Sequence, residues 1–321
     1  MANVPKKQVL SLNRQVIIPS ITGMSKVFVK STLLAIGLFF GSSFSSVFAA
    51  DPFRTEQPRE IGEHTETAFK QIFFMGDYQG AKIPLAEAKK TEPNEPLAYT
   101  LSASLAYTEK DWEGVRTNAS KTLDAAESLR TSDPLRGNLY LAIGHFMAGT
   151  YLYEKEGAIA AIQKLQLVFK YFDAAEEVDP KDPELNLIKG YMDLLLAVNL
   201  PFSSAEDAIA RFEANASPEY LVDRGIAVAY RDLKEYDKAL ASVDKALEIA
   251  PDNPEHYYLK GQILRKIGKN QRDIPTLKLA LDHFSTALVK EDQLPSFIVK
   301  PLKRETRQTE ELIQEIESGA I

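Results

Sequence analysis

The chain has 321 residues, of which 45% are hydrophobic, and it carries 38 Lys and Arg residues against 45 Asp and Glu residues. This composition is typical of a folded globular protein and excludes a collagen-like or intrinsically disordered chain. There is no cysteine, which excludes a disulfide framework, a thiol nucleophile and a metal site built on cysteine.

Residues 1–49 are predicted to be a leader that contains a secretory signal peptide. They include no acidic residue, and Lys26 and Lys30 precede a short apolar run at 32–40. A positively charged N-terminal region, a short apolar centre and small residues before the cleavage site are the features of secretory signal peptides. The run is far shorter than the roughly 20 residues of a membrane span. We therefore expect cleavage after Ala49 and no stable membrane insertion afterwards.

The leader leaves three alternatives open. Met24 opens a signal of ordinary length, so residues 1–23 are either an early start or a second targeting element. The alternative cleavage site lies after Ala50. The expected location is the periplasm, with the thylakoid lumen as the alternative.

Without the leader the chain is distinctly acidic. Removing the leader's five basic residues from the 38 leaves 33 against 45 acidic residues, a formal charge of −12. An acidic surface disfavours nucleic acid as the main ligand. It also disfavours adhesion to anionic lipid surfaces.

Residues 50–62 are predicted to form a short extended lead-in, because they are polar and contain Pro52 and Pro58. From Glu63 onward the hydrophobic pattern is helical almost without interruption, and no segment has the alternation of a strand. We therefore expect an all-α protein.

A short phrase with an aromatic residue recurs along this helical part. Gly-Asp-Tyr-Gln-Gly-Ala at 76–81 returns 34 residues later as Lys-Asp-Trp-Glu-Gly-Val, and Lys-Glu-Tyr-Asp-Lys-Ala follows at 234–239. Small residues at fixed places in each unit would let two antiparallel helices approach closely. The period and these residues resemble the tetratricopeptide (TPR) repeat. This resemblance implies a right-handed α-solenoid of TPR-like antiparallel helix pairs.

The resemblance covers residues 63–292 and indicates about six helix pairs. The fifth pair matches best, with Tyr230, Tyr236, Ala239 and Pro251 in register. The third pair holds about a dozen extra residues, and the sixth has an insertion around Asn270–Thr276. Residues 293–321 are expected to form a charged C-terminal capping helix.

Motifs for catalysis are missing from the sequence. The four histidines show no metal-binding spacing, and there is no Gly-rich phosphate loop or Gly-x-Ser-x-Gly turn. The acids of Asp179–Glu184 fit no EF-hand spacing and are interpreted as a turn between repeats whose acids cap the next helix. We predict no enzyme activity, no cofactor and no metal site.

Positions on the first helix of each unit line the groove in proteins of this family. That register places Arg231 and Arg265 at equivalent positions of neighbouring units, and Arg224 two helical turns before Arg231. Arginines could bind a carboxylate-bearing peptide through paired hydrogen bonds, or could simply pair with nearby acids such as Asp232. The predicted partner-binding residues are Arg224, Arg231, Arg265, Tyr258, Gln262 and Lys266.

Earlier first-helix positions are apolar or neutral, including Tyr107, Leu187 and Tyr191. The run Leu194-Leu195-Leu196 is unusually apolar for a helix that lines solvent. We interpret this run as buried core, with a hydrophobic binding surface as the alternative.

These observations favour a non-catalytic scaffold or adaptor that binds a partner protein or peptide in a concave groove. A carrier for a small molecule or ion is the first alternative, with a pocket formed by the insertions of units three and six. An enzyme with residues scattered over the helices is the second. The leader and repeats are similar to those of exported cyanobacterial TPR proteins, which include assembly factors for photosynthetic complexes.

Overall fold

The computed structural model describes residues 51–199 and 204–319, and over these residues the chain forms thirteen helices and no strand. The all-α prediction is confirmed. The leader, with the predicted signal peptide and its cut after Ala49, lies outside the described residues. Among the helices that are described, none combines the length and hydropathy that a bilayer span requires.

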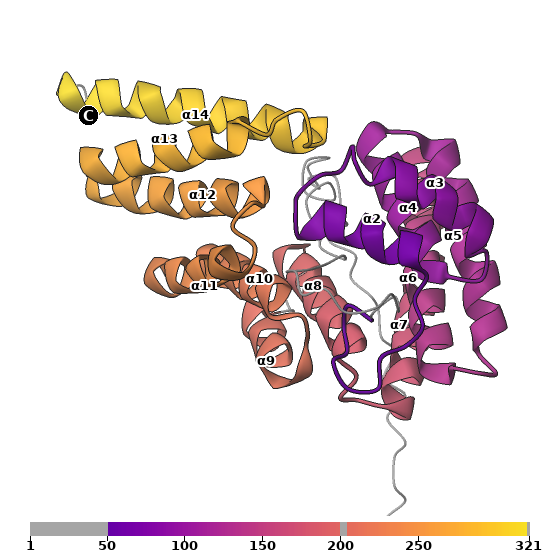
Figure 1. Ribbon diagram of the computed structural model, residues 1–321. Coiled ribbons are helices and arrows are strands. Elements are labelled where there is room, and N and C mark those ends of the chain that lie inside the picture. The colour runs from indigo at the N-terminus through magenta and orange to yellow at the C-terminus, as the bar shows by residue number, and fades with distance from the viewer. Residues whose placement is uncertain (1–50, 200–203, 320–321) are drawn as a thin grey trace, which may run out of the picture.

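The helices form six antiparallel pairs and one final helix, as expected for a TPR-like solenoid (Figure 1). The first three pairs are α2 (Glu63–Phe73) with α3 (Lys82–Thr91), α4 (Pro96–Glu109) with α5 (Trp112–Leu129), and α6 (Pro134–Glu156) with α7 (Ala158–Val178). The next three are α8 (Pro183–Asn199) with α9 (Ala205–Asn215), α10 (Glu219–Asp232) with α11 (Tyr236–Ile249), and α12 (Pro254–Gln271) with α13 (Ile274–Leu288). The final helix is α14 (Ser296–Glu317).

Caps followed by proline explain why the first helices of several units begin where they do. Asp133 accepts a hydrogen bond from the Arg136 amide before α6, and Asn253 accepts one from the Glu255 amide before α12. Such caps satisfy backbone donors that have no partner inside the helix, and the proline that follows needs no donor there. Asp182 caps α8 in the same way through the Leu185 amide, 2.8 Å away. The Asp179–Glu184 turn therefore does what the sequence predicts.

Small residues allow the close helix contacts that the repeat requires. The ring of Phe212 on α9 lies between Gly190 of α8 and Gly225 of α10. A Cβ atom at either glycine would come within 2.5–2.6 Å of that ring, which is closer than real contacts allow. One aromatic side chain thus joins two consecutive units.

The extra residues of units three and six lengthen helices. In unit three α6 has 23 residues and α7 has 21, and Gly157 alone separates them. In unit six α12 continues to Gln271, so that only Arg272 and Asp273 connect it to α13. Neither insertion forms a loop that folds over a groove.

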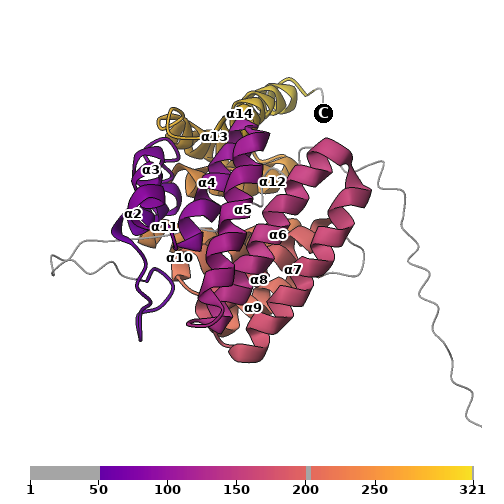
Figure 2. The same cartoon turned by 90° about the vertical axis from the view of Figure 1, so that its right-hand side faces the viewer.

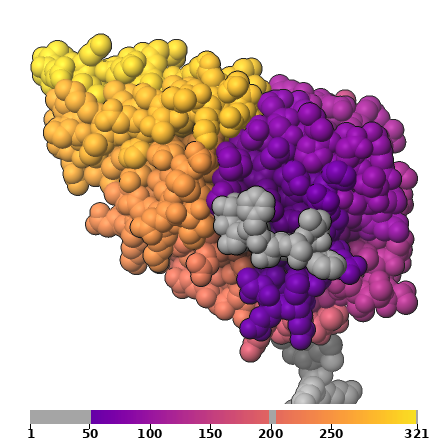
Figure 3. Space-filling model, in the orientation of Figure 1, coloured from indigo at the N-terminus to yellow at the C-terminus, as the bar shows by residue number. Residues whose placement is uncertain are grey.

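The solenoid curls until its first unit touches its sixth. Asn253 donates a hydrogen bond of 2.8 Å from Nδ2 to the Phe73 carbonyl, and the Tyr78 hydroxyl pairs with the Glu255 carboxylate. The Tyr78 amide donates to the Gln293 carbonyl at 3.1 Å. Figures 1 and 2 show α2 beside the start of the C-terminal helices, and in Figure 3 α12–α14 extend from this contact as an arm. We call α12–α14 the C-terminal arm.

Candidate functional site

The six residues predicted to bind a partner lie on α10 and α12, but the structure separates them into two groups. Arg231, Gln262 and Tyr258 form one connected set at the side of the arm where first helices face each other. Arg265 and Lys266 continue that side toward the end of α12, where Lys266 is exposed. Arg224 lies apart from them, inside the curl.

Arg231 is held by two partners. Its Nε donates to Asp232 at 2.8 Å, and one terminal nitrogen donates to Gln262 Oε1 at 2.9 Å. The pair with Asp232 is the surface ion pair that the alternative interpretation of the sequence anticipated. Gln262 connects Arg231 to α14, because its Nε2 donates a hydrogen bond to the Glu305 carboxylate at 3.1 Å.

Glu305 and Gln308, on α14, belong to this site although the sequence did not point to them. Tyr258 donates its hydroxyl hydrogen to Glu305 at 3.1 Å, and burial together with that carboxylate raises the pKa of Tyr258. Arg265 donates to Gln308 Oε1 at 3.3 Å. The signal that could have found them is the solenoid register, since α14 occupies the place of a seventh first helix beside α12.

Arg224 does not line an open groove. Its side chain is only 14% exposed and donates to Glu255 at 2.7 Å. Tyr191 and Tyr78 also lie near it, and these neighbours raise the pKa of Arg224 against the opposing effect of burial. Arg224 thus takes part in the contact between units four, five, six and one, so its predicted role in partner binding stays without support.

The earlier apolar positions are core. Leu187, Tyr191 and Tyr107 are all buried, with at most 6% of their surface exposed. Leu194 is buried as well, whereas Leu195 and Leu196 are half-buried. The core interpretation of the leucine run therefore holds for Leu194 and only in part for Leu195 and Leu196.

A stripe of polar side chains continues from Tyr258 to the end of α12. Tyr258, Gln262, Arg265 and Lys269 are three or four residues apart on α12 and so share one helix face, and Arg272 follows directly after the last residue of the helix. We call this set the arm stripe. Within the part of the chain that the structure describes, no carboxylate lies within ion-pairing distance of the cations of Arg265, Lys269 and Arg272. Residues 254–319 carry eleven Lys and Arg against ten Asp and Glu, whereas residues 51–253 carry 22 against 35.

A cavity of about 180 Å³ lies elsewhere, where the first unit meets the start of α14. Tyr78, Lys82, Thr108 and Pro295 are among its lining residues. In residues 51–199 and 204–319, no three His, Asp or Glu side chains converge as metal ligands would.

Comparison with known families identifies the repeats. A family model described as "TPR repeat" matches residues 228–268, which extend from within α10 to within α12. These residues therefore form a TPR repeat. The matched stretch contains Arg231, Tyr258, Gln262, Arg265 and Lys266, so the stripe begins on a recognised repeat. No curated protein is similar enough to the chain to count as a match. TPR units are platforms for protein–protein interaction, and this is the role that the family supports.

Proposed function

We propose that the chain is a non-catalytic adaptor that binds an acidic segment of a partner protein along the arm stripe. The observation that carries the proposal is the pair Arg265 and Lys269 on one face of α12, with Arg272 directly after the helix, all without acidic partners among the described residues. An adaptor that helps a larger complex assemble is one form that this function could take.

The length of the stripe suits a peptide. From Tyr258 to the end of α12 at Gln271 the helix rises about 20 Å, at roughly 1.5 Å per residue. An extended chain covers this length with about six residues. Guanidinium groups bind carboxylates through two parallel hydrogen bonds, and Tyr258 offers a flat apolar surface at one end. A short acidic segment would therefore meet both charge and apolar contacts.

The alternative of a small-molecule carrier has less support. It depended on insertions that would fold over the groove, but these residues extend α6, α7 and α12. The cavity at the first unit, about 180 Å³, is smaller than the roughly 300–1,000 Å³ typical of ligand pockets. The insertions therefore supply neither the lid nor the pocket.

We propose further that the adaptor works after export, in the periplasm or in a comparable lumen. The support is the leader, with its positive start, short apolar run and small residues before Ala49. Mass spectrometry of the protein isolated from its own cells tests this. A mature N-terminus at Ala50 or Asp51 is expected, and an intact leader would contradict it.

The test of partner binding uses Arg265, Lys266 and Lys269, all replaced by Glu. Arg224 is left unchanged because its replacement would disturb the contact between units. The matched control replaces the exposed lysines Lys89, Lys121 and Lys155 by Glu, which changes the net charge by the same amount at distant sites.

Two measurements apply to these variants. The first is binding of a labelled Glu-rich peptide, for which we expect at least a tenfold loss in the arm variant and a much smaller loss in the control. The second is affinity capture from native extract, in which only the arm variant should lose partners. Equal binding by both variants would overturn the proposal.

A further inference from the structure

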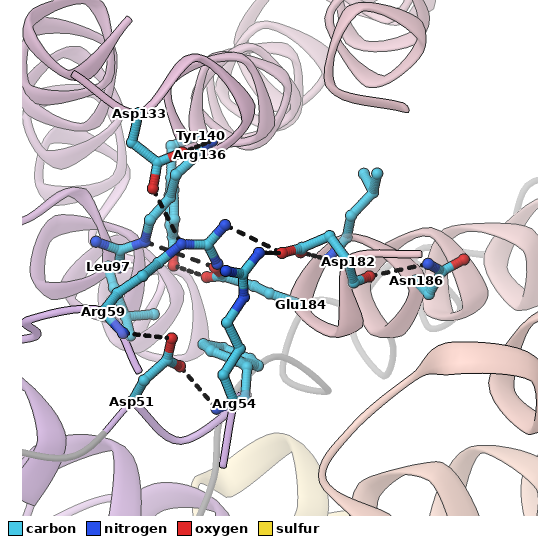
Figure 4. A network of polar contacts seen from close by, with 12 residues as sticks. Asp51, Arg54, Arg59, Leu97, Asp133, Arg136, Tyr140, Asp182, Glu184 and Asn186 are labelled. Carbon is cyan, nitrogen blue, oxygen red and sulfur yellow. Dashed lines mark hydrogen bonds and ion pairs between the residues drawn. The ribbon is translucent and has the colours of Figure 1, made fainter. Parts of the chain in front are cut away.

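Residues 51–61, the lead-in segment, are firmly attached to distant parts of the solenoid (Figure 4). Arg59 reaches three carboxylates, with hydrogen bonds of 3.0 Å to Asp133, Asp182 and Glu184. Arg54 pairs with Asp182 as well. These acids stand at the starts of α6 and α8, more than 70 residues away in the sequence. The segment therefore lies on a surface made by other units.

The solenoid positions the acceptor carboxylates without help from the lead-in segment. Asp133 and Asp182 are the caps of α6 and α8. Tyr140 of α6 donates its hydroxyl hydrogen to Glu184 at 2.6 Å, and both side chains are fully buried. Because caps and a buried tyrosine fix these groups, the site keeps its geometry when the lead-in segment is absent.

Without the lead-in segment this site would have an excess of negative charge. Arg136 is the cation that the solenoid itself contributes, and it serves both Glu95, through hydrogen bonds of 2.6 and 2.9 Å, and Glu184, at 3.5 Å, so that one cation meets several carboxylates. Burial raises the pKa of Glu184 to about 7, against the lowering effect of Arg136 and Arg59. Arg59 therefore makes ionisation of Glu184 easier, which a cationic ligand would also do.

The lead-in segment has the shape of a bound peptide. Asp51 accepts hydrogen bonds from the amides of Phe53, at 2.8 Å, and Arg59, at 3.1 Å, and so closes a compact loop. Phe53 is 1% exposed and meets the ring of Phe69 edge-on at 5.3 Å. One aromatic anchor and two arginines thus hold a segment that has no regular structure of its own.

We propose that the starts of α6 and α8, together with Phe69 of α2, form a second binding site for a short looped peptide with an aromatic residue and two arginines, and that the lead-in segment occupies it as an intramolecular ligand. A partner with such a sequence would compete with the lead-in segment. This site prefers the opposite charge to the arm stripe and stands independently of it.

The experiment uses the mature chain with Arg54→Ala and Arg59→Ala, which weakens the internal ligand. The probe is a labelled peptide of residues 51–62. We expect it to bind this double variant at least about tenfold more tightly than the wild-type chain, whose own segment competes at high effective concentration. A peptide in which both arginines are alanine should not bind. The matched control chain carries Arg116→Ala and Arg307→Ala, at exposed positions, and should behave as the wild type.

Absence of peptide binding to a folded double variant, or equal binding of the arginine-free peptide, would overturn the proposal. Circular dichroism and urea unfolding establish whether the double variant is folded. If the double variant is not folded, hydrogen exchange of the wild-type chain tests the proposal instead. We then expect the amides of Phe53 and Arg59 to exchange at least about tenfold faster than those of the α8 core, through local release. Equal protection would show that the segment leaves only on global unfolding, and the proposal would fail.

Discussion

The interior of the curl and the C-terminal arm use the same kinds of side chain in different ways. Inside the curl, Arg59 and Arg224 are mostly buried, and Arg59 donates to carboxylates of distant units while Arg224 donates to Glu255 of the next unit. On the arm, Arg265 donates to Gln308, and Lys269 and Arg272 are exposed. Arg224 and Arg265 both come from the first-helix pattern of the repeat. The curvature of the solenoid, more than the position of a residue within its repeat, therefore decides which arginines can meet a partner.

Arg224 and Arg265 offer the largest contrast in stability. Arg224→Ala leaves the Glu255 carboxylate, 9% exposed, without its cation. Removing one partner of a buried ion pair typically costs about 3–5 kcal/mol. Arg265→Ala should change the free energy of unfolding by no more than about 0.5 kcal/mol, since it removes one exposed contact. Urea unfolding of both variants measures the difference, and similar costs would remove the distinction between curl and arm.

Two buried groups should give the stability of the curl opposite dependences on pH. Burial raises the pKa of Glu184 from 4.5 to about 7, so its contribution is present below pH 4.5 and is lost as pH rises toward 7. Burial and Arg224 lower the pKa of His256 from 6.5 to about 3, so its contribution is lost as pH falls from 6.5. Between pH 4.5 and 6.5 the two trends oppose each other.

Single variants should separate these trends. Glu184→Gln should make the free energy of unfolding rise with pH between 4.5 and 6.5, and His256→Leu should make it fall, each by up to about 3 kcal/mol. Urea unfolding at several pH values is the measurement. If both variants keep the pH dependence of the wild type, neither group titrates as described.

A smaller loss of stability is expected from a substitution at the contact between the first and sixth units. Gly76 has a φ of +68°, and a Cβ atom there would lie 2.5 Å from Pro254. Gly319 has nearly the same φ, +71°, but nothing within 4 Å of such an atom. Both alanine variants carry the backbone strain of about 1 kcal/mol, so any excess cost of Gly76→Ala over Gly319→Ala reports the contact with Pro254. Equal melting temperatures for the two variants would argue against that contact.

The sequence predicted the repeat architecture because its signals are local. Tyr236, Ala239 and Pro251 mark a helix pair through spacing alone, and the fold that they indicate is confirmed. The lead-in was expected to be extended and polar, but its packing depends on carboxylates 74 to 125 residues away. The environment of Arg224 likewise includes Tyr78 of the first unit, which only the curl brings to Glu255. Long-range curvature sums small rotations between units, and no single repeat encodes it.

Only part of the candidate site was predicted, again because the sequence signals are local. Arg231, Tyr258 and Gln262 come together because neighbouring first helices keep a common register. Glu305 was missed because α14 was considered only as a cap, although it continues the row of first helices. The residues that the sequence grouped correctly are those separated by one repeat.

The contact between the first and sixth units is the central structural claim, and cross-linking tests it most directly. The chain has no cysteine, so Met75→Cys with Asp252→Cys creates a unique pair beside the contact of Gly76 with Asn253 and Pro254. The control pair, Met75→Cys with Glu317→Cys, uses the far end of α14, about 30 Å along that helix from the contact. A short bis-maleimide should join the first pair rapidly within one chain and leave the control pair unjoined. Equal or absent cross-linking of both pairs would show an open solenoid and contradict the account.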